Sequence, residues 1–491
     1  MLLLGIDVGT SSIKVSVVDA AMAQCIATAQ YPDAETPITS RQPGWAEQSP
    51  KLWWQHVQQA IKKVIAQNNF NAKQIGAIGI AYQMHGLVTV DAEGAALRDA
   101  IIWCDSRAVP YGEAAAQNIG PQKCLERLLN SPGNFTAAKL AWVKEAEPQV
   151  YERIHKIMLP GDYIAFKLTG EATTSVSALS EGIFWDFKQD DVSADVMQYF
   201  GFDESLIPPV QPVFSNHGKL SKAVAADLGL QQGIPVTYKS GDQPNNALSL
   251  NVLQPGEVAA AAGTSGVIYG VTDSLMYDKQ SRVNTFAHVN YKGNDKRLGV
   301  LLCINGTGIL NSWVKQNMAA GTTYQQMNAA AAKVAAGADG LLVLPFGNGA
   351  ERMLNNKIVG AHFSGIDLNM HTQAHLFRAV QEGIAFAFRY GLDIMRESGM
   401  NPGVIRAGMA NMFLSPLFTE AFVNATGVPV ELYASDGSVG AAIGAGIGAG
   451  VFNESNAFSN TKPMQVVQPT NANLYNELYQ KWKSVLLKQL G

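Results

Sequence analysis

The order of apolar and polar residues along the chain predicts both strands and helices. Residues 2–8 are an almost continuous apolar run, and residues 13–19 alternate as a half-buried strand does. A helix rich in Trp, Val and Ile is predicted over 53–65, and a further strand over 75–80. This mixture of patterns is typical of an α/β protein.

Longer apolar patterns continue through the rest of the chain. Residues 118–149 and 151–170 predict helices that are interrupted near prolines. Helices are also predicted over 307–320, 323–336 and 474–490. Within this second half, a short apolar run predicts a buried strand that ends near Phe346. The small-residue stretch 440–446 has the spacing of a helix that packs closely against a neighbour.

A turn of small residues occurs once in each half of the chain. Gly263-Thr264-Ser265-Gly266 lies between two apolar stretches, as Gly9-Thr10-Ser11-Ser12 lies between the first two predicted strands. A repeated strand–turn–strand unit predicts two related domains. We place these domains at residues 1–245 and 246–491.

Length and charge agree with two domains and narrow the possible partners. A chain of 491 residues is too long for one ordinary core. The net charge of −4 provides no basic surface for nucleic acid or for an anionic membrane. The four cysteines contain no Cys-x-x-Cys pair, so neither a zinc site nor a disulfide framework is indicated. No export signal or membrane-length apolar run is present, and a cytoplasmic protein is expected.

Two stretches of the sequence together suggest phosphoryl transfer. The first is Lys239-Ser240-Gly241-Asp242-Gln243, which places the carboxylate of Asp242 at the predicted end of a strand. The second is the turn around Gly263 and Thr264, whose backbone N–H groups and hydroxyls can face an anion. A fixed base near a phosphate loop is suited to the transfer of a phosphoryl group.

Asp7 stands beside the first turn, which includes Thr10 and Ser11. A carboxylate at this place can hold Mg²⁺ through water while the turn binds phosphate oxygens. A plain polar hairpin turn with a capping aspartate explains the same residues. The recurrence of the turn in the second half favours phosphate binding and predicts a nucleotide between the two domains.

Polar residues follow two predicted strands of the first domain, at the position where α/β proteins bind ligands. Met84 and His85 follow one strand, and Trp103 and Asp105 follow a later one. A lone histidine after a strand is more often structural than functional. The nearby Trp-x-Asp-x-Arg sequence favours ligand contact for His85.

The chain resembles the FGGY family of sugar kinases over nearly its whole length. The motifs that carry the resemblance are Ile6–Ser11, Ser240–Gln243, Gly263–Gly266, Phe135–Trp142 and Gly360–Ile366. The resemblance implies two ribonuclease-H-like lobes of the actin and Hsp70 type, with the active site in the cleft between them. It further implies ATP and Mg²⁺ as cofactors, with Asp242 as the general base.

The resemblance also places an adenosine site at Gly408 and Asn411. In this part of the family pattern a pair of glycines precedes a helix. Here Arg406 and Ala407 stand in place of the leading glycines, which is the main departure from the pattern.

Within the family, Gln83-Met84-His85-Gly86 resembles the xylulokinases, whereas glycerol kinases carry an Arg-Glu pair at this place. The resemblance implies phosphorylation of a ketopentose, D-xylulose to D-xylulose 5-phosphate. The residues implied to contact the sugar are Met84, His85, Trp103, Asp105 and Gln243. The alternatives are gluconate or another pentulose or polyol, and, from a different class, a non-sugar ATPase of the actin and Hsp70 type. A homodimer is a further expectation, with neither nucleic acid nor membrane as a partner.

Overall fold

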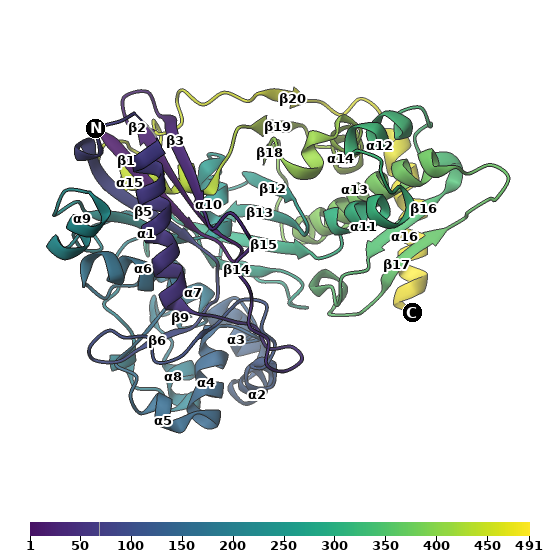
Figure 1. Cartoon of the computed structure of the whole chain (residues 1–491). Coiled ribbons are helices and arrows are strands. Elements are labelled where there is room, and N and C mark those ends of the chain that lie inside the picture. Colours follow the sequence, from purple (N-terminus) through teal and green to yellow (C-terminus); the bar gives the residue numbers. More distant parts are fainter. Residues whose placement is uncertain (68) are drawn as a thin grey trace.

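The computed structural model describes residues 1–67 and 69–491 of the chain. They form two lobes that lie side by side, each around a central sheet (Figure 1). The first sheet consists of β1 (Leu2–Val8), β2 (Ile13–Asp19), β3 (Gln24–Tyr31), β5 (Ile75–Tyr82) and β11 (Val236–Gly241). The order across this sheet is β11-β5-β1-β2-β3.

The second sheet repeats the topology of the first. Its strands are β12 (Val258–Ala262), β13 (Gly266–Thr272), β14 (Asn284–Ala287), β15 (Leu298–Ile304), β18 (Ile405–Gly408), β19 (Val430–Tyr433) and β20 (Gln465–Val467). In the first sheet β1, β2 and β3 are antiparallel neighbours, and β5 and β11 run parallel to β1. In the second, β12, β13 and β15 are antiparallel neighbours, and β18 and β19 run parallel to β12. The duplication confirms the predicted α/β fold with two related lobes.

Helices cover both faces of the first sheet. Helices α1 (Pro50–Gln67) and α6 (Pro160–Thr169) share a core with Leu4 and Ile6 of β1. Helix α15 (Gly437–Gly448) packs on the opposite face, where Leu3 meets Ala442. The predicted helix over 53–65 is therefore confirmed as the central part of α1.

Two glycines allow α15 to approach the backbone of the first sheet. A Cβ atom on Gly5 would lie 1.8 Å from the carbonyl oxygen of Ser438, and one on Gly79 would lie 2.0 Å from that of Ala441. This contact confirms the close packing predicted for residues 440–446. A domain boundary at residue 245 assigns each sheet to its own half of the chain. It does not assign α15 to the lobe on which it packs, because α15 comes from the second half of the chain and lies on the first sheet. The boundary itself stays a prediction.

Further helices and short strands complete the first lobe, many of them below its sheet (Figure 1). They are α2 (Val109–Ile119), α3 (Pro121–Leu128), α4 (Thr136–Ala146), α5 (Pro148–Tyr151), α7 (Val176–Glu181), α8 (Ala194–Phe200), α9 (Lys222–Leu228), β4 (Glu47–Gln48), β6 (Val88–Val90), β7 (Ala100–Ile101), β8 (Lys156–Met158), β9 (Trp185–Asp186) and β10 (Asp191–Val192). The prediction of a continuous helix over 151–170 is wrong, because β8 pairs with β6 before α6 begins. Strand pairing overrides the local helical pattern there.

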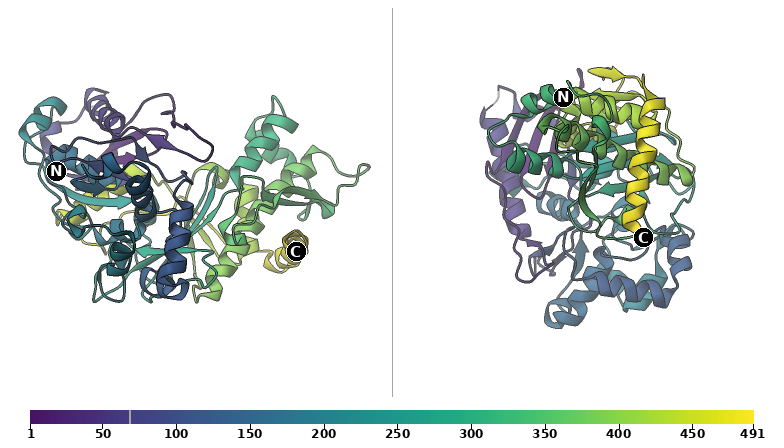
Figure 2. Two further views of the ribbon diagram at one scale, coloured as in Figure 1. Left: turned by 90° about the horizontal axis from the view of Figure 1, so that it is seen from below. Right: turned by 90° about the vertical axis from the view of Figure 1, so that its right-hand side faces the viewer.

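The helices of the second lobe pack on its sheet and on one another. They are α11 (Gly308–Met318), α12 (Tyr324–Ala331), α13 (Gln373–Glu397), α14 (Pro416–Thr426) and α16 (Ala472–Leu490), and the strands β16 (Leu342–Phe346) and β17 (Gly360–Ser364) form a separate hairpin. The helices α11 and α16 fall where the sequence predicts them, whereas α12 begins as predicted but ends at Ala331, before the predicted end at residue 336. Helix α16 lies on the outer side of this lobe, away from the first lobe (Figure 2).

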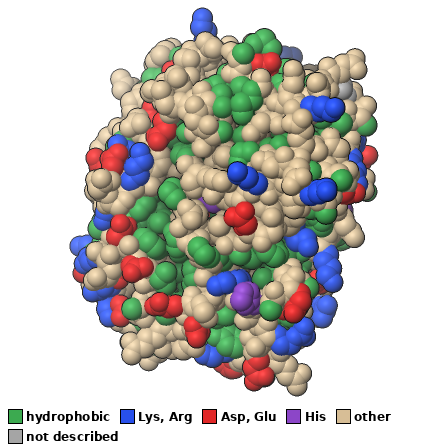
Figure 3. Space-filling view, turned by 90° about the vertical axis from the view of Figure 1, so that its left-hand side faces the viewer, with side chains coloured by type: hydrophobic (Ala, Val, Ile, Leu, Met, Phe, Trp, Pro, Cys, Tyr) green, Lys and Arg blue, Asp and Glu red, His purple; other side chains and the backbone are tan. Residues whose placement is uncertain are grey.

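The surface carries charges of both signs. On the outer face of the first lobe, basic and acidic side chains are intermixed (Figure 3). Within the described part of the chain, no helix combines the length and the apolar character needed to cross a membrane.

Candidate active site

The carboxyl ends of parallel strands bring two aspartates to one edge of the first sheet. Asp7 is the penultimate residue of β1, and Asp242 is the first residue of α10 (Asp242–Ser249), directly after β11. Strand β5 lies between these strands, and its register aligns Asp7 with Ala81 and Ala81 with Ser240. Two residues that are distant in the sequence are therefore close in space.

Both aspartates have raised pKa values. Burial raises the pKa of Asp242 to about 7, and the negative charge of Asp7 is the second cause. Burial also raises the pKa of Asp7 to about 6, helped by the charge of Asp436 and opposed by that of Lys14. A carboxyl group with a pKa near 7 can exchange protons at neutral pH, so Asp242 is suited to general base catalysis.

Asp7 lies among negative charges that suit a cation, since the charge of Asp436 raises its pKa and its own charge raises that of Asp242. In the described ranges, no group of three or more His, Cys, Asp and Glu side chains is arranged to hold a metal. Mg²⁺ commonly keeps several waters and binds one or two carboxylates together with substrate phosphates. A cation beside Asp7 would also offset the repulsion between this carboxylate and that of Asp242.

The turn after β1 is bonded to the loop that carries Trp103. The Thr10 hydroxyl accepts a hydrogen bond from Trp103 Nε1 at 3.0 Å and donates one to Gln83 Oε1 at 3.2 Å. The side chain of Gln48 donates to the Thr10 carbonyl at 2.8 Å. Ser11 is exposed at the tip of this turn. The predicted phosphate residue Thr10 and the predicted sugar residue Trp103 are thus direct neighbours.

The loop after β5 places Met84 and His85 beside the residue that precedes Asp242. A Cβ atom on Gly241 would lie only 2.6 Å from Met84 Cγ. His85 Nδ1 lies 3.0 Å from the carbonyl oxygen of Glu181, the last residue of α7. These contacts join the predicted sugar loop to the strand that leads to the predicted base.

His85 is a neutral imidazole of defined tautomer. Burial, and secondly the positive charge of Lys139, lower its pKa to about 3. Because a carbonyl oxygen can only accept, Nδ1 carries the hydrogen in the bond to Glu181. Nε2 therefore keeps a lone pair and can accept a hydrogen bond from a substrate hydroxyl. The ring packs edge-on against Phe135, with the centroids 4.9 Å apart.

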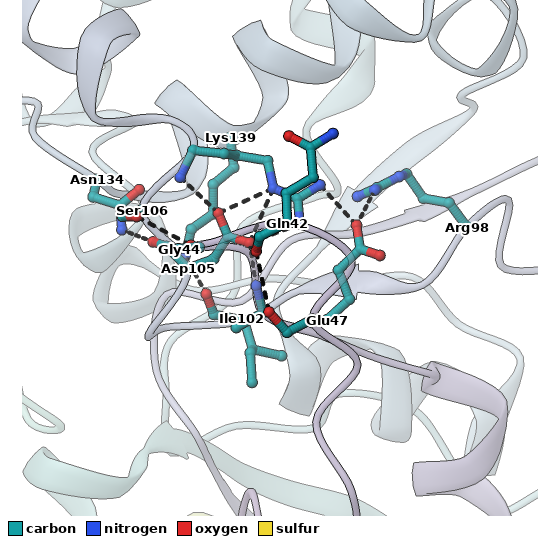
Figure 4. Close-up of polar contacts among 12 residues, drawn as sticks. Gln42, Gly44, Glu47, Arg98, Ile102, Asp105, Ser106, Asn134 and Lys139 are labelled. Carbon is teal, nitrogen blue, oxygen red and sulfur yellow. Dashed lines mark hydrogen bonds and ion pairs between the residues drawn. The ribbon is translucent and has the colours of Figure 1, made fainter.

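Asp105 lies in a buried network of ion pairs (Figure 4). Its Oδ2 atom accepts hydrogen bonds from the backbone N–H of Ala46 at 2.6 Å and from Arg107 Nη2 at 2.7 Å. Its Oδ1 atom accepts hydrogen bonds from the backbone N–H and from Nε of Arg107. Arg107 also donates to Glu47 at 2.8 Å and stacks on the ring of Trp45. Both oxygens are therefore used by protein donors, and the sugar contact of Asp105 stays a prediction.

The other two predicted sugar residues are accessible to different degrees. Trp103 is 52% exposed, with its ring nitrogen bonded to Thr10. Gln243 is half-buried and hydrogen-bonds to the carboxyl group of Asp242 through its backbone N–H and its side chain. Gln243 can therefore orient the predicted base, whether or not it also contacts the sugar.

The turn in the second lobe borders a cavity of about 450 Å³. The carbonyl oxygens of Gly263 and Thr264 each accept from the hydroxyl of Thr307 at 3.1 Å. Gly263 and Thr264 line the cavity together with Asn411 and with Asn311 of α11. Three of the predicted nucleotide residues therefore share one cavity.

The altered adenosine motif has a structural explanation. Arg406, which replaces a family glycine, lies on β18 and forms ion pairs with Glu257 at 3.1 Å and Glu431 at 3.3 Å. Gly408 ends β18 and is not among the residues that line the cavity, whereas Asn411 is. The arginine therefore joins β18 to the neighbouring β19 and to the residue before β12.

Three residues of these sites are absent from the sequence-based set. Glu181 is buried beneath His85, and Asn311 lies in the second-lobe cavity. Lys139 contacts the His85 loop from α4 and is fully buried. For Lys139 the sequence offers a signal, a lysine within the otherwise apolar stretch 137–143. No comparable signal marks Glu181 or Asn311, because polar residues in helices are common.

Comparison with known proteins is consistent with this geometry. The model of the N-terminal domain of FGGY carbohydrate kinases matches residues 2–249, and that of the C-terminal domain matches residues 258–449. A xylulose kinase of Staphylococcus xylosus is 28% identical over 489 residues, which cover 98% of this chain and 99% of that protein. The crystal structure of a xylulose kinase from Rhodospirillum rubrum has a TM-score of 0.88 at 26% identity, with 99% of each chain covered.

A gluconate kinase from Lactobacillus acidophilus also shares the fold. Its TM-score is 0.90 at 20% identity, with 100% of this chain and 98% of that chain covered. Matches to both domain models, in order and over most of the sequence, establish the family. The chain belongs to the FGGY family of carbohydrate kinases.

Proposed function

We propose that the protein transfers the γ-phosphoryl group of ATP to D-xylulose, giving D-xylulose 5-phosphate and ADP. The observation that carries the proposal is the meeting of Asp242, Asp7 and the Met84-His85 loop at one edge of the first sheet. The similarity to proteins named xylulose kinase, over nearly the full length of both chains, supports this choice of sugar.

Asp242 acts as the general base in this proposal. Its carboxylate accepts the proton of the attacking sugar hydroxyl while the hydroxyl oxygen bonds to the γ-phosphorus and ADP leaves. Gln243 orients the carboxylate through its hydrogen bonds. Because phosphoryl transfer depends mainly on position and charge, a carboxylate that is correctly placed is sufficient.

The sugar is bound on the first lobe. His85 Nε2 accepts a hydrogen bond from one hydroxyl, and Met84 and Trp103 provide apolar contact beside it. We expect the two lobes to close on the substrates and to exclude water, which would otherwise attack ATP. Asp105 supports the Trp103 loop through its bonds to Arg107 and Ala46.

ATP binds between the two turns. Thr10 and Ser11 approach its phosphates from the first lobe, and Gly263 and Thr264 do so from the second. Mg²⁺, held at Asp7 through water, would neutralise phosphate charge. Gly408 supports the adenosine side from the end of β18, and Asn411 faces it from the cavity wall.

One experiment distinguishes the proposed function from the two alternatives. Release of ADP should be measured with ATP and Mg²⁺ alone, and then with D-xylulose, D-ribulose, gluconate or glycerol added. A D-xylulose kinase shows ADP release that depends on that sugar. A preference for gluconate or another polyol would show that D-xylulose is the wrong substrate, while the protein would still be a carbohydrate kinase. ADP release that no sugar affects would favour an ATPase of the actin and Hsp70 type. The homodimer and the cytoplasmic location stay predictions.

The Asp7→Ala variant should use Mg·ATP poorly while it still binds the sugar. Residues that hold a metal through an outer sphere typically contribute about 10- to 100-fold to metal affinity or activity. We therefore expect kcat/KM for Mg·ATP to fall by about this factor, with a smaller change in sugar affinity measured by calorimetry. Asp19→Ala, at the opposite end of the same hairpin, is the control. Loss of sugar affinity alone would place Asp7 in the sugar site.

Asn311 has the features of an adenine contact. It is 7% exposed, it lines the second-lobe cavity, and its Oδ1 is buried without a hydrogen-bond partner in the described structure. Buried polar atoms usually have partners, so an unpaired acceptor in a cavity suggests a ligand donor. The N6 amino group of adenine is such a donor, whereas guanine presents an acceptor at the equivalent position.

The Asn311→Ala variant should discriminate less between ATP and GTP. Loss of one hydrogen bond corresponds to about a three- to tenfold rise in the KM for ATP. Asn317→Ala, in the same helix but exposed, is the matched control. Steady-state kinetics with both nucleotides provide the measurement, and an unchanged ratio of kcat/KM values would exclude Asn311 from the adenine site.

A further inference from the structure

The first turns of α4 touch both loops that carry the proposed sugar residues. Lys139 Nζ donates to the carbonyl oxygen of His85 at 2.8 Å and to that of Ile102 at 3.1 Å. Ile102 directly precedes Trp103. The hydroxyl of Thr136 donates to the same His85 carbonyl at 3.2 Å. One ammonium group therefore joins two loops that follow different strands, β5 and β7. Figure 4 shows Lys139 beside Ile102 of the later loop.

Lys139 is an unusual residue to find at this position. Its side chain is fully buried, and no ion pair is formed by it in the described ranges. Burial lowers the pKa of its ammonium group to about 7, although the charge of Asp105 opposes the change. Burying an amine without a carboxylate partner is unfavourable, so an apolar residue would suit the helix core better. The benefit must come from the two carbonyl groups that it holds.

The His85 carbonyl needs to be held because of the conformation of this residue. His85 has a φ of 63°, in the left-handed region that non-glycine residues seldom adopt. Two donors from α4 fix the orientation of its carbonyl group. The imidazole packs against Phe135, which directly precedes α4. Helix α4 and the residue before it therefore contact both the backbone and the ring of His85, and Glu181 holds the ring through Nδ1.

A second bond extends this arrangement to the later loop. The side chain of Asn134, just before α4, donates to the carbonyl oxygen of Asp105. The start of α4 is thus bonded to residues on either side of Trp103. Movement of Lys139 would change the separation of His85 and Trp103, the two groups proposed to lie on either side of the sugar.

We propose that Lys139 is a positioning residue that sets the separation of His85 and Trp103 and thereby the affinity and selectivity for the sugar. The inference rests on the sugar site proposed at His85 and Trp103. Lys139 itself is not expected to touch the substrate, because both of its described hydrogen bonds go to backbone carbonyl groups.

Helix α4 provides a matched control. Lys144 lies in the same helix and likewise donates to two backbone carbonyl groups, those of Phe200 and Gly201. These carbonyl groups belong to the end of α8, not to either sugar loop. The variants Lys139→Met and Lys144→Met therefore remove the same kind of contact at two places.

The test compares steady-state kinetics of the two variants with those of the wild type. We expect Lys139→Met to raise the KM for the sugar by about tenfold or more and to leave the KM for ATP unchanged. We also expect a smaller ratio between the kcat/KM values for the preferred sugar and for the other sugars. Lys144→Met should leave both KM values unchanged. Lys139→Arg, which keeps the charge and donors, should restore part of the sugar affinity. Should Lys139→Met fail to fold, Thr136→Val removes the second donor to the His85 carbonyl and should cause a smaller rise in the same KM.

The outcomes separate this inference from the proposed function. A wild type that phosphorylates none of the sugars would overturn the proposed function. A wild type with a clear sugar preference that Lys139→Met leaves unchanged would overturn the inference alone. Equal increases in the KM values for sugar and ATP in Lys139→Met would also overturn it, because they would indicate a general structural role.

Discussion

Replacement of Asp242 by asparagine should reduce sugar phosphorylation by about 10² to 10⁴-fold, the range typical of a lost general base. Asparagine keeps the size of the side chain but cannot accept the proton of the attacking hydroxyl. Affinity for ATP should change little, because Asp242 follows the first-lobe strand β11 and the proposed adenosine cavity is in the second lobe. Coupled-assay kinetics and the melting temperature of the purified variant provide the measurement.

The pH dependence of the wild type provides a second test of Asp242. The base must be ionised to act, and burial raises its pKa to about 7. Bound Mg²⁺ would offset the charge of Asp7, the second cause of this raised pKa, and so shift it somewhat below 7. We therefore expect kcat/KM for the sugar to fall as the pH decreases toward this pKa, and we expect the residual activity of Asp242→Asn to lack this decrease. Asp227→Asn, on the surface of α9, serves as the control. Near-normal turnover by a folded Asp242→Asn protein would refute the assignment.

D-xylulose should be phosphorylated far more efficiently than glycerol. Sites that hydrogen-bond a substrate hydroxyl can reject an analogue without it by as much as roughly 10⁴-fold. His85 Nε2 is the acceptor that the structure provides beside Met84, and glycerol is too short to reach every polar group that a ketopentose contacts. We expect a difference of orders of magnitude in kcat/KM between the two substrates.

The His85→Ala variant tests whether this histidine selects the sugar. Its KM for D-xylulose should rise, or its turnover fall, with little change in ATP affinity. His155→Ala, at an exposed histidine just before β8, is the matched control. An unchanged sugar profile would show that His85 has only its structural bonds to Glu181 and Lys139. A clear preference of the wild type for gluconate would contradict D-xylulose as the substrate but would leave the assignment as a kinase in place.

Local patterns in the sequence were sufficient to predict the elements that carry the chemistry. The alternation over 13–19 and the turn at Gly9 predicted the strands β1 and β2. The expectation of a half-buried strand over 13–19 is wrong, because helices cover both faces of the sheet and residues 15–18 are all buried. The recurrence of the turn at Gly263 predicted a second lobe, and five of the strands in its sheet repeat the order of the first sheet. Glycine next to Asp242 marked the end of a strand. These features depend on neighbouring residues, which a sequence shows directly.

Tertiary structure alone decided which of these residues meet. The parallel register of β1, β5 and β11 brings Asp7 and Asp242 together, and the crossovers that set this register leave no periodic signal. The same is true of β8, which forms where a helix was predicted because β6 lies beside it. Contacts between distant segments depend on the packing of the whole core.

The roles of individual polar residues were the least predictable feature. Asp105 occurs in a motif that suggests substrate contact, but the structure buries it and satisfies it with protein groups. Lys139 is likewise buried and bonded to protein groups, although the sequence predicted no role for it. Arg406 breaks the adenosine pattern and instead pairs with two glutamates across neighbouring strands. A sequence shows which residues can donate, accept or ionise. Only the fold decides whether their partners are substrate or protein, because burial and the nearest oppositely charged group both depend on distant parts of the chain.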